Sequence, residues 1–155
     1  MLKASNLPRA LAQISAAIWF LLTATLVDAH TESFWFGHPG QAANVTRTIK
    51  MLATDIKFTP TAITVRKGET VMFEIVNHGK LEHEFVLGDN AEQIEHDREM
   101  AAMPDMKMNH VNGVGVAPGK AAHLVWTFTK SGTLQYACHV PGHFVAGMVG
   151  QLKIK

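Results

Sequence analysis

Short runs in which apolar and polar residues alternate recur along the chain from Val45 to its last residue, with Gly, Asn, Ser or Pro between them. Alternation with a period of two is typical of strands that bury one face, so each run predicts a strand. The runs are 45–52, 58–68, 70–80, 81–88, 121–132, 133–140 and 148–155. So many short strands separated by turns predict an all-β fold, an antiparallel sandwich or barrel.

The same alternation assigns side chains to faces, because residues two apart point the same way along a strand. His83 falls on an apolar face, and its companions there are Leu81, Phe85 and Leu87. Cys138 shares a face with Leu134 and Tyr136, and Met148 shares one with Leu152 and Ile154. The pattern therefore predicts that His83, Cys138 and Met148 all point into the core.

Two segments depart from the alternation. Residues 91–103 carry acidic residues early, contain no β-branched run and are followed by Pro104, which together predict a short helix inserted between strands. Residues 30–44 are predicted to form an irregular leader. Its aromatic residues are expected to pack against the domain, but the sequence does not indicate where. The domain itself is predicted to span 45–155.

Residues 1–29 predict a signal peptide. Lys3 and Arg9 precede an apolar run, and a small-x-small sequence ends at Ala29. Export to the periplasm follows from this interpretation. The alternative is an uncleaved anchor, although a run of about 18 residues is at the lower limit for spanning a bilayer. Only an uncleaved segment would bring the protein to a membrane.

Composition excludes one class of partner. The chain has 14 basic and 13 acidic residues, a net charge of +1. Without residues 1–29 it keeps 12 of each, and no basic run is present, so nucleic acid is not an expected partner. All nine histidines and seven of the eight methionines remain.

Cys138 is the only cysteine of the chain. Cysteines of exported proteins usually pair, so a single one indicates an intermolecular bridge, a reactive thiol or a metal ligand. An inert buried thiol is the further alternative. Cys138, His143 and Met148 stand at Cys-x4-His-x4-Met spacing around Pro141-Gly142, a turn that would let the three side chains converge. His83 is well placed to supply a fourth ligand from a distant strand.

A thiolate, two imidazoles and a thioether form a donor set that suits copper in both oxidation states. Two histidines and a cysteine with a weak axial methionine are the arrangement of blue-copper electron-transfer sites. A fold that holds these ligands between the preferred geometries of Cu(I) and Cu(II) keeps structural change on electron transfer small.

These residues carry a family resemblance. "CHVPGHFVAGM" together with "HEFVLG" resembles the cupredoxin (blue-copper, plastocyanin/azurin-like) family over roughly residues 45–155. "GKLEHEFVLG", "MPDM" and "APGK" look most like periplasmic copper-tolerance cupredoxins of bacteria. The resemblance implies a Greek-key barrel of about eight strands and one type 1 copper. Its ligands would be His83, Cys138, His143 and Met148.

The function that this resemblance implies is not enzymatic. It is copper tolerance, by binding copper or by passing electrons to a redox or copper-handling protein partner. One alternative is a dedicated electron carrier serving a respiratory enzyme. Another is a small copper enzyme acting on O2 or a nitrogen oxide, which would need the open position that Met148 is expected to fill. Many family members have Asn after the first histidine, whereas this chain has Glu84, so the family's hydrogen bonds around the ligands do not carry over.

Other histidines and methionines could also bind metal, but the sequence leaves their roles open. His139 lies on the strand face opposite Cys138 and is expected either to be exposed or to link to a second redox centre. The methionines of the 100–108 segment predict either a weak second Cu(I) site or packing in the core; they are Met100, Met103, Met106 and Met108. His30, if cleavage exposes it, could chelate copper. The remaining histidines are expected at the surface: His38, His78, His96, His110 and His123.

Other chemistries are excluded by what the sequence lacks. A dinuclear CuA site needs two cysteines, and this chain has one. Multicopper oxidases and copper nitrite reductases need further copper centres on further domains. No phosphate-binding glycine loop or hydrolytic constellation is evident in the sequence.

Overall fold

The computed structural model describes residues 34–103 and 110–155. These residues belong to one unit, Thr31–Lys155. The predictions for the signal peptide, His30, Met106 and Met108 lie outside the described residues. No helix within the described ranges is long and apolar enough to cross a membrane.

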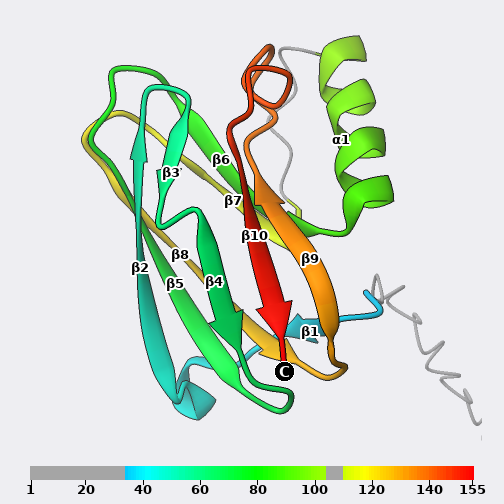
Figure 1. Ribbon diagram of the computed structural model, residues 1–155. Coiled ribbons are helices and arrows are strands. Elements are labelled where there is room, and N and C mark those ends of the chain that lie inside the picture. Colours follow the sequence, from blue (N-terminus) through cyan, green and yellow to red (C-terminus); the bar gives the residue numbers. More distant parts are fainter. Residues whose placement is uncertain (1–33, 104–109) are drawn as a thin grey trace, which may run out of the picture. The chain divides into compact units, whose positions relative to one another are not determined.

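Ten strands form two five-stranded sheets in the described part of the chain (Figure 1). The first sheet has the order β1 (Gly37–Pro39), β8 (Ala121–Phe128), β5 (Thr70–Asn77), β2 (Arg47–Thr54) and β3 (Lys57–Thr59). The second has the order β4 (Ala62–Val65), β10 (Val149–Ile154), β9 (Gly132–Ala137), β6 (His83–Gly88) and β7 (Gly113–Val116). The pairs β2–β5 and β4–β10 are parallel and the others antiparallel. The all-β prediction is confirmed in its sandwich form.

The number of strands exceeds the expected eight for local reasons. The run 58–68 is divided by Pro60, which lacks an amide hydrogen for a ladder, so it forms β3 and β4. β7 has the sequence Gly-Val-Gly-Val, whose glycines weaken the strand signal. β1 is three residues long and lies within the segment predicted as an irregular leader.

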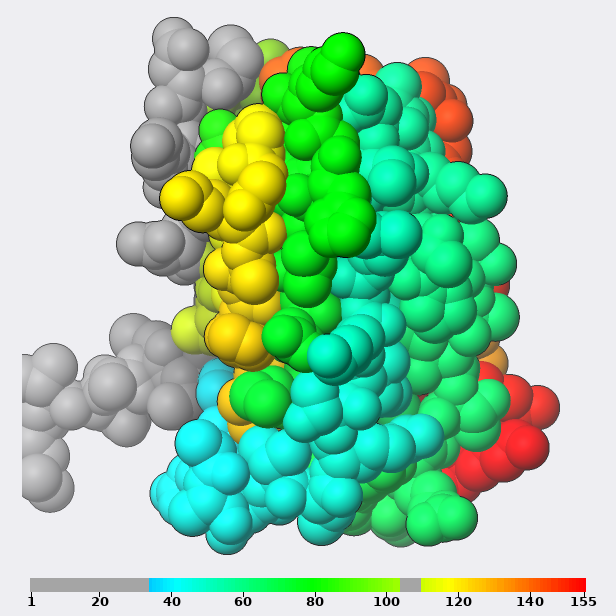
Figure 2. Space-filling view, turned by 90° about the vertical axis from the view of Figure 1, so that its left-hand side faces the viewer, coloured from blue at the N-terminus to red at the C-terminus, as the bar shows by residue number. Residues whose placement is uncertain are grey.

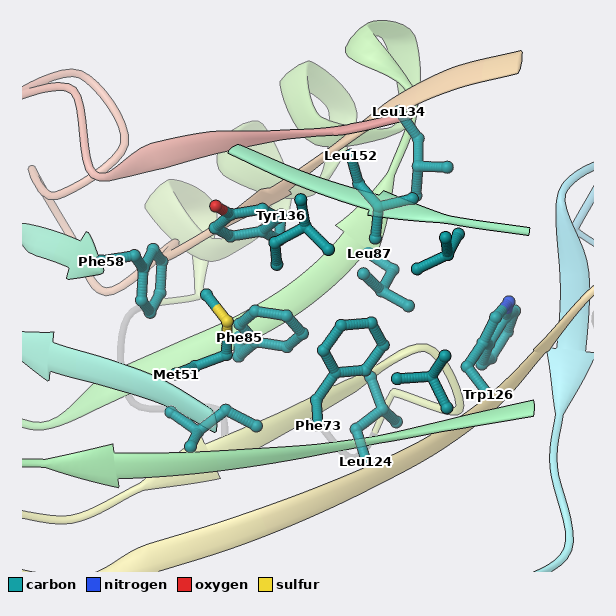
Figure 3. Close-up of a cluster of buried hydrophobic side chains, with 14 of the residues drawn as sticks. Met51, Phe58, Phe73, Phe85, Leu87, Leu124, Trp126, Leu134, Tyr136 and Leu152 are labelled. Atoms are coloured by element: carbon teal, nitrogen blue, oxygen red, sulfur yellow. The ribbon is translucent and has the colours of Figure 1, made fainter. Parts of the chain in front are cut away.

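The space between the sheets is filled by the inward positions of the strands. Figure 3 shows aromatic rings from both sheets meeting there, with Phe85 stacked on Tyr136 at a centroid distance of 5.3 Å. Cys138 and Met148 belong to the same buried cluster. Burial on this scale is the main stabilising contribution to such a fold. The predicted inward facing of Cys138 and Met148 is confirmed.

The N-terminal aromatic residues close one end of this core. Phe36 is fully buried and packs on Trp126 with ring centroids 5.4 Å apart, while β1 pairs with β8. On the side of β2, shown in Figure 2, the cyan segment of that strand lies at the surface next to the segment of β3 and β4. No described helix covers this face.

The inserted helix, α1 (Asn90–Ala102), is confirmed within one residue of its predicted bounds. Asp89 caps it by accepting hydrogen bonds from the amides of Ala91 and Glu92, and the Glu92 carboxylate accepts one from the amide of Asp89. This capping box satisfies amide groups that an open helix end would leave unpaired. Figure 1 shows α1 (green) beside β9, on the outer side of the second sheet.

Candidate metal centre

The candidate ligands meet at one end of the second sheet. β6 begins at His83, β9 ends at Ala137 just before Cys138, and β10 begins just after Met148. Because β6 and β9, and β9 and β10, are antiparallel neighbours, these three ends coincide. The loop between β9 and β10 crosses the same end (Figure 1).

This loop folds back through local hydrogen bonds. The amide of His143 donates to the carbonyl of Val140 at 2.9 Å, and the amide of Met148 donates to the carbonyl of His143 at 2.9 Å. Gly142 has φ +87°, a conformation that side-chain-bearing residues rarely adopt. The predicted turn at Pro141-Gly142 is therefore present, and it returns His143 toward Cys138.

Two imidazole nitrogens lie beside the cysteine sulfur. Cys138 Sγ lies 3.3 Å from Nδ1 of His143 and 3.9 Å from Nδ1 of His83. The three atoms all lie within 4.8 Å of one another, which no other group of His, Cys, Asp or Glu achieves in residues 34–103 and 110–155. Met148 is fully buried, and its carbonyl accepts a hydrogen bond from the Cys138 amide at 3.1 Å. The structure thus brings the predicted residues to one place.

Burial sets the protonation of this site. It raises the pKa of the Cys138 thiol to about 11, although hydrogen bonds from the amides of Glu84 and Val140 oppose the rise. It also lowers the pKa of His83, with the charge of His143 adding to the effect, and lowers the pKa of His143. The metal-free site therefore holds a neutral thiol and neutral imidazoles at neutral pH. Neutral imidazole is the form that binds a metal ion, and the thiol would release its proton on binding.

Glu84 contacts the site through its main chain. Its amide donates to Cys138 Sγ at 3.3 Å, a bond independent of the side chain. The Glu84 side chain points instead to the other face of the sheet, where its Oε2 lies 3.7 Å from Nε2 of His96.

Asn77 is a supporting residue that sequence reasoning missed. Its buried side chain donates to the carbonyls of Leu81 and Val116 at 2.7 and 3.0 Å and accepts from the amide of Gly79 at 2.8 Å. These bonds tie down the loop that leads into His83. The sequence signal for this role was a polar residue, Asn77, at the end of an apolar strand and shortly before the run that contains His83.

The prediction for Leu81 is wrong. Leu81 is predicted on the inner face of a strand, but it is 44% exposed because β6 begins only at His83.

Two histidine predictions are wrong. The alternative in which His139 is exposed and the surface position predicted for His96 are both contradicted, because these residues are 0% and 7% exposed. Both are covered because α1 packs over the outer face of β6 and β9. The other alternative for His139, a link to a second redox centre, stays a prediction. His110 is partly buried, whereas His38, His78 and His123 are exposed as predicted.

The methionine segment is only partly described. Met100 is buried and Met103 is 43% exposed, while Met106 and Met108 lie outside the described residues. Packing accounts for Met100. A second Cu(I) site at these methionines stays a prediction.

Comparison with known proteins agrees with this geometry. Residues 43–155 match the family of copper binding proteins described as plastocyanin/azurin. The Copper-resistant cuproprotein CopI of Rubrivivax gelatinosus is 47% identical over 128 residues, covering 82% of this chain and 78% of that protein. The Copper-resistant cuproprotein CopI of Pseudomonas aeruginosa is 40% identical, covering 92% and 93%.

Solved structures show the same fold. Auracyanin B superposes with a TM-score of 0.66 at 19% identity, over 77% of this chain and 96% of that one. Auracyanin A, a "blue" copper protein of Chloroflexus aurantiacus, superposes with a TM-score of 0.59 at 25% identity, over 70% and 98%.

The fold and site together define a cupredoxin: a two-sheet sandwich with a thiol and two imidazoles converging at one end. The chain belongs to the plastocyanin/azurin family of copper-binding proteins. The family resemblance predicted from the sequence is confirmed. The donors fit copper, because two imidazole Nδ1 atoms are turned to a buried cysteine sulfur, the His2Cys set of such sites.

Proposed function

We propose that the protein binds one copper ion through His83, Cys138, His143 and Met148 and works as an exported, non-enzymatic copper protein in copper tolerance. The observation that carries the proposal is the placement of the Cys138 sulfur within 3.9 Å of both Nδ1 atoms in a fully buried setting. A thiol beside two imidazoles supplies the His2Cys donor set of a blue-copper site.

Each residue has a distinct part. Cys138 would hold the ion through its thiolate, His83 and His143 would hold it through their imidazoles, and Met148 would add a thioether donor. The bound copper would supply one-electron redox chemistry. The amide of Glu84 adds a hydrogen bond to the sulfur, which steadies the thiolate and tunes the potential.

The scaffold limits movement of the ligands. His83 begins β6, Cys138 directly follows β9 and Met148 directly precedes β10, the three central strands of the second sheet. All three residues are 0% exposed. Packing at interior density leaves such side chains little freedom. Small ligand movement is what a one-electron carrier requires, and a site saturated by four protein donors leaves no position for a substrate.

His143 is the route we infer for electrons. It is the only one of the four proposed ligands with any exposure, 6%, and it sits in the loop that carries Val145, which is 82% exposed. A partner protein that covers this loop would approach the imidazole edge. The protein would meet such a partner in the periplasm, because we infer that residues 1–29 are a signal peptide that directs export to that compartment.

The tolerance role is supported by the names of the relatives at 40–47% identity. Deleting the gene should lower the copper concentration at which the source bacterium stops growing, and a plasmid copy should restore it. The Cys138→Ser copy should fail to restore growth. Unchanged copper resistance together with a stalled respiratory pathway would instead favour a dedicated electron carrier.

The copper site itself is tested by absorption and EPR spectra of the Cu(II)-loaded protein. The wild type should show an intense thiolate-to-Cu(II) band, and Cys138→Ser should lose it. The matched control is His123→Gln, an exposed change on β8, which should leave the band unchanged. A wild type without the band would refute the type 1 assignment.

A further inference from the structure

The helix α1 rests on the sheet through polar side chains. Its buried residues are Gln93, His96 and Met100. His96 lies at the centre of a group of three imidazoles: its ring centroid is 4.5 Å from that of His139 and 4.1 Å from that of His110, with nearly perpendicular planes. We call these three residues the histidine cluster. A helix that only covered a sheet would bury apolar residues here.

Carboxylates surround the histidine cluster. Nε2 of His96 lies 3.7 Å from Oε2 of Glu84, and its Nδ1 lies 3.9 Å from Oε2 of Glu99. Nδ1 of His139 lies 3.5 Å from Oδ1 of Asp97. Nitrogen and carboxylate donors therefore alternate over a short distance between α1 and the sheet.

Gln93 determines which nitrogen of His139 is available. The Gln93 side-chain amide donates to the carbonyls of Val86 and Gln135, so its Oε1 can only accept. Oε1 lies 2.6 Å from Nε2 of His139, which must therefore carry the hydrogen. A neutral His139 then presents the lone pair of Nδ1 toward the Asp97 carboxylate. Two acceptors facing each other repel unless a proton or a metal cation lies between them.

Several buried atoms in this arrangement have a charged neighbour but no hydrogen bond. Nε2 of His96, Nδ1 of His139 and Oε2 of Glu84 are buried without a hydrogen bond. Leaving such groups unsatisfied costs free energy, so native proteins rarely do so without a ligand or a function. The three atoms come from three elements, α1, the end of β9 and β6, and all lie on one side of the sheet.

The histidine cluster borders a cavity through His96 and His110. The cavity has a volume of about 380 Å³, and its lining also includes Glu92, Glu95 and Glu99. The three glutamates give this cavity an acidic wall, which favours the entry of cations.

We propose that the histidine cluster, with Glu84 and Asp97, is a second metal site, for a divalent cation of the Cu(II) type. Imidazole and carboxylate without thiolate are the donors that Cu(II) takes in tetragonal sites. The donor atoms of this group do not all lie within 4.8 Å of one another, as those of the first site do. Binding therefore requires one imidazole to turn about its Cβ–Cγ bond, a torsion with a broad energy well.

The second site would share its strands with the first. Cys138 and His139 are neighbours in the chain, and so are His83 and Glu84, with one member of each pair on either face of the sheet. Two metal ions would thus be joined by single peptide links across the β6–β9 pair. This proposal does not depend on the first site, because it rests on other side chains.

The test is Cu(II) titration of the metal-stripped full-length protein, followed by EPR and nitrogen electron-spin-echo spectroscopy. Wild type and His123→Gln should bind one more Cu(II) than His96→Gln, and that extra ion should show imidazole nitrogen without a thiolate band. His96→Gln should raise its dissociation constant more than about 100-fold, since loss of even an outer partner costs 10- to 100-fold. The thiolate band of the first site should persist in His96→Gln.

Equal stoichiometry and equal nitrogen signals in wild type and His96→Gln would overturn the proposal and leave the cluster as a polar contact holding α1. His110→Gln, at the rim of the cavity, provides a second variant if circular dichroism shows that His96→Gln does not fold. It should weaken the same ion, and an unaltered titration would count against the site. Loss of the thiolate band in wild type would bear on the first site alone.

Discussion

The main-chain amide of Glu84 donates to the sulfur of Cys138 at 3.3 Å, while the side chain of the same residue lies on the opposite face of the sheet, 3.7 Å from His96. Glu84 therefore contacts both the candidate metal centre and the histidine cluster. The alternation of a strand explains this, because β6 presents successive side chains to opposite faces.

Replacing Met148 with Leu should raise the reduction potential and keep the thiolate band. The axial ligand tunes the potential of blue-copper sites, and an apolar side chain in its place would remove an electron donor from the more highly charged Cu(II), which would favour the reduced form. A rise of about 60 mV would correspond to a tenfold change in relative affinity for the two oxidation states. Redox titration measures it, with Met72→Leu on β5 as the matched control. An unchanged potential would argue against axial ligation by Met148.

Replacing Asn77 with Ala should destabilise the fold by about 3 kcal/mol, because buried carbonyl groups of Leu81 and Val116 lose their donor. Copper affinity should also fall, since the loop before His83 is released. Urea unfolding and copper competition measure the two effects. His78→Ala changes an exposed side chain next to it and should alter stability by less than about 0.5 kcal/mol. Equal free energies of unfolding and equal copper affinities in the two variants would contradict the supporting role of Asn77.

Gly150 is expected to tolerate no side chain. A Cβ at this position of β10 would overlap the ring of Tyr136, whose hydroxyl is held by a 2.7 Å hydrogen bond to the carbonyl of Pro60. Gly150→Ala should therefore cost about 3 kcal/mol, at the upper end for overpacking. Gly115→Ala is the control, because its Cβ would meet nothing within 4 Å. Thermal unfolding compares them, and similar melting temperatures would contradict the packing argument.

Removing the cap of α1 should loosen the helix without affecting the first metal site. Asp89→Ala should cost about 1–2 kcal/mol, and Asp89→Asn, which retains a capping oxygen, should cost less. Asp89 also accepts a hydrogen bond from Nε1 of Trp35 at 3.0 Å, so the indole N–H resonance of Trp35 should shift in the alanine variant. Denaturant unfolding and NMR measure these changes. Equal stability of both variants would show that the cap contributes nothing.

The metal-free protein should be most stable between about pH 6.5 and 9. On the acid side, burial lowers the pKa of His83 and of His143, and lowers that of His139 to about 4. The unfolded chain therefore binds more protons below pH 6.5, and stability falls as pH falls. On the alkaline side, burial raises the pKa of Cys138 to about 11, so the unfolded chain loses that proton first and stability falls as pH rises from 9.

Urea unfolding across this range checks both limbs. Cys138→Ala should flatten the alkaline limb by roughly 2–3 kcal/mol and leave the acid limb in place. Some alkaline loss should persist in that variant, because burial also raises the pKa of Tyr136. A wild type equally stable at pH 8 and pH 11 would refute the buried, protonated thiol.

Much of the first site could be predicted because its determinants are local. Parity along a strand decides which way Cys138 and Met148 face, and Gly142 in a short loop decides that His143 turns back. The position of His83 beside Cys138 could not be derived from local sequence, since nothing local indicates that β6 lies beside β9. The antiparallel pairing of β6 with β9 in the folded structure places His83 there.

The outer face of the second sheet could not be predicted in this way. The segment that forms α1 has no apolar stripe, so its pattern does not tell which side is buried, and Gln93 and His96 look like solvent-exposed residues. His139 is predicted to lie on the strand face opposite Cys138, and exposure on that face is the alternative that the structure contradicts. Both assignments failed because polar residues from one element covered polar residues of another.

The sequence by itself determined the all-β class, the helix and the residues that face the core at the metal end, since strand periodicity and turn chemistry act between near neighbours in the chain. Only the tertiary structure decided what lies over the back of β6 and β9. That depends on the packing of α1 against β6, which precedes it directly, and against β9, which begins 30 residues after α1 ends. The contact with β9 leaves no periodic trace in the sequence.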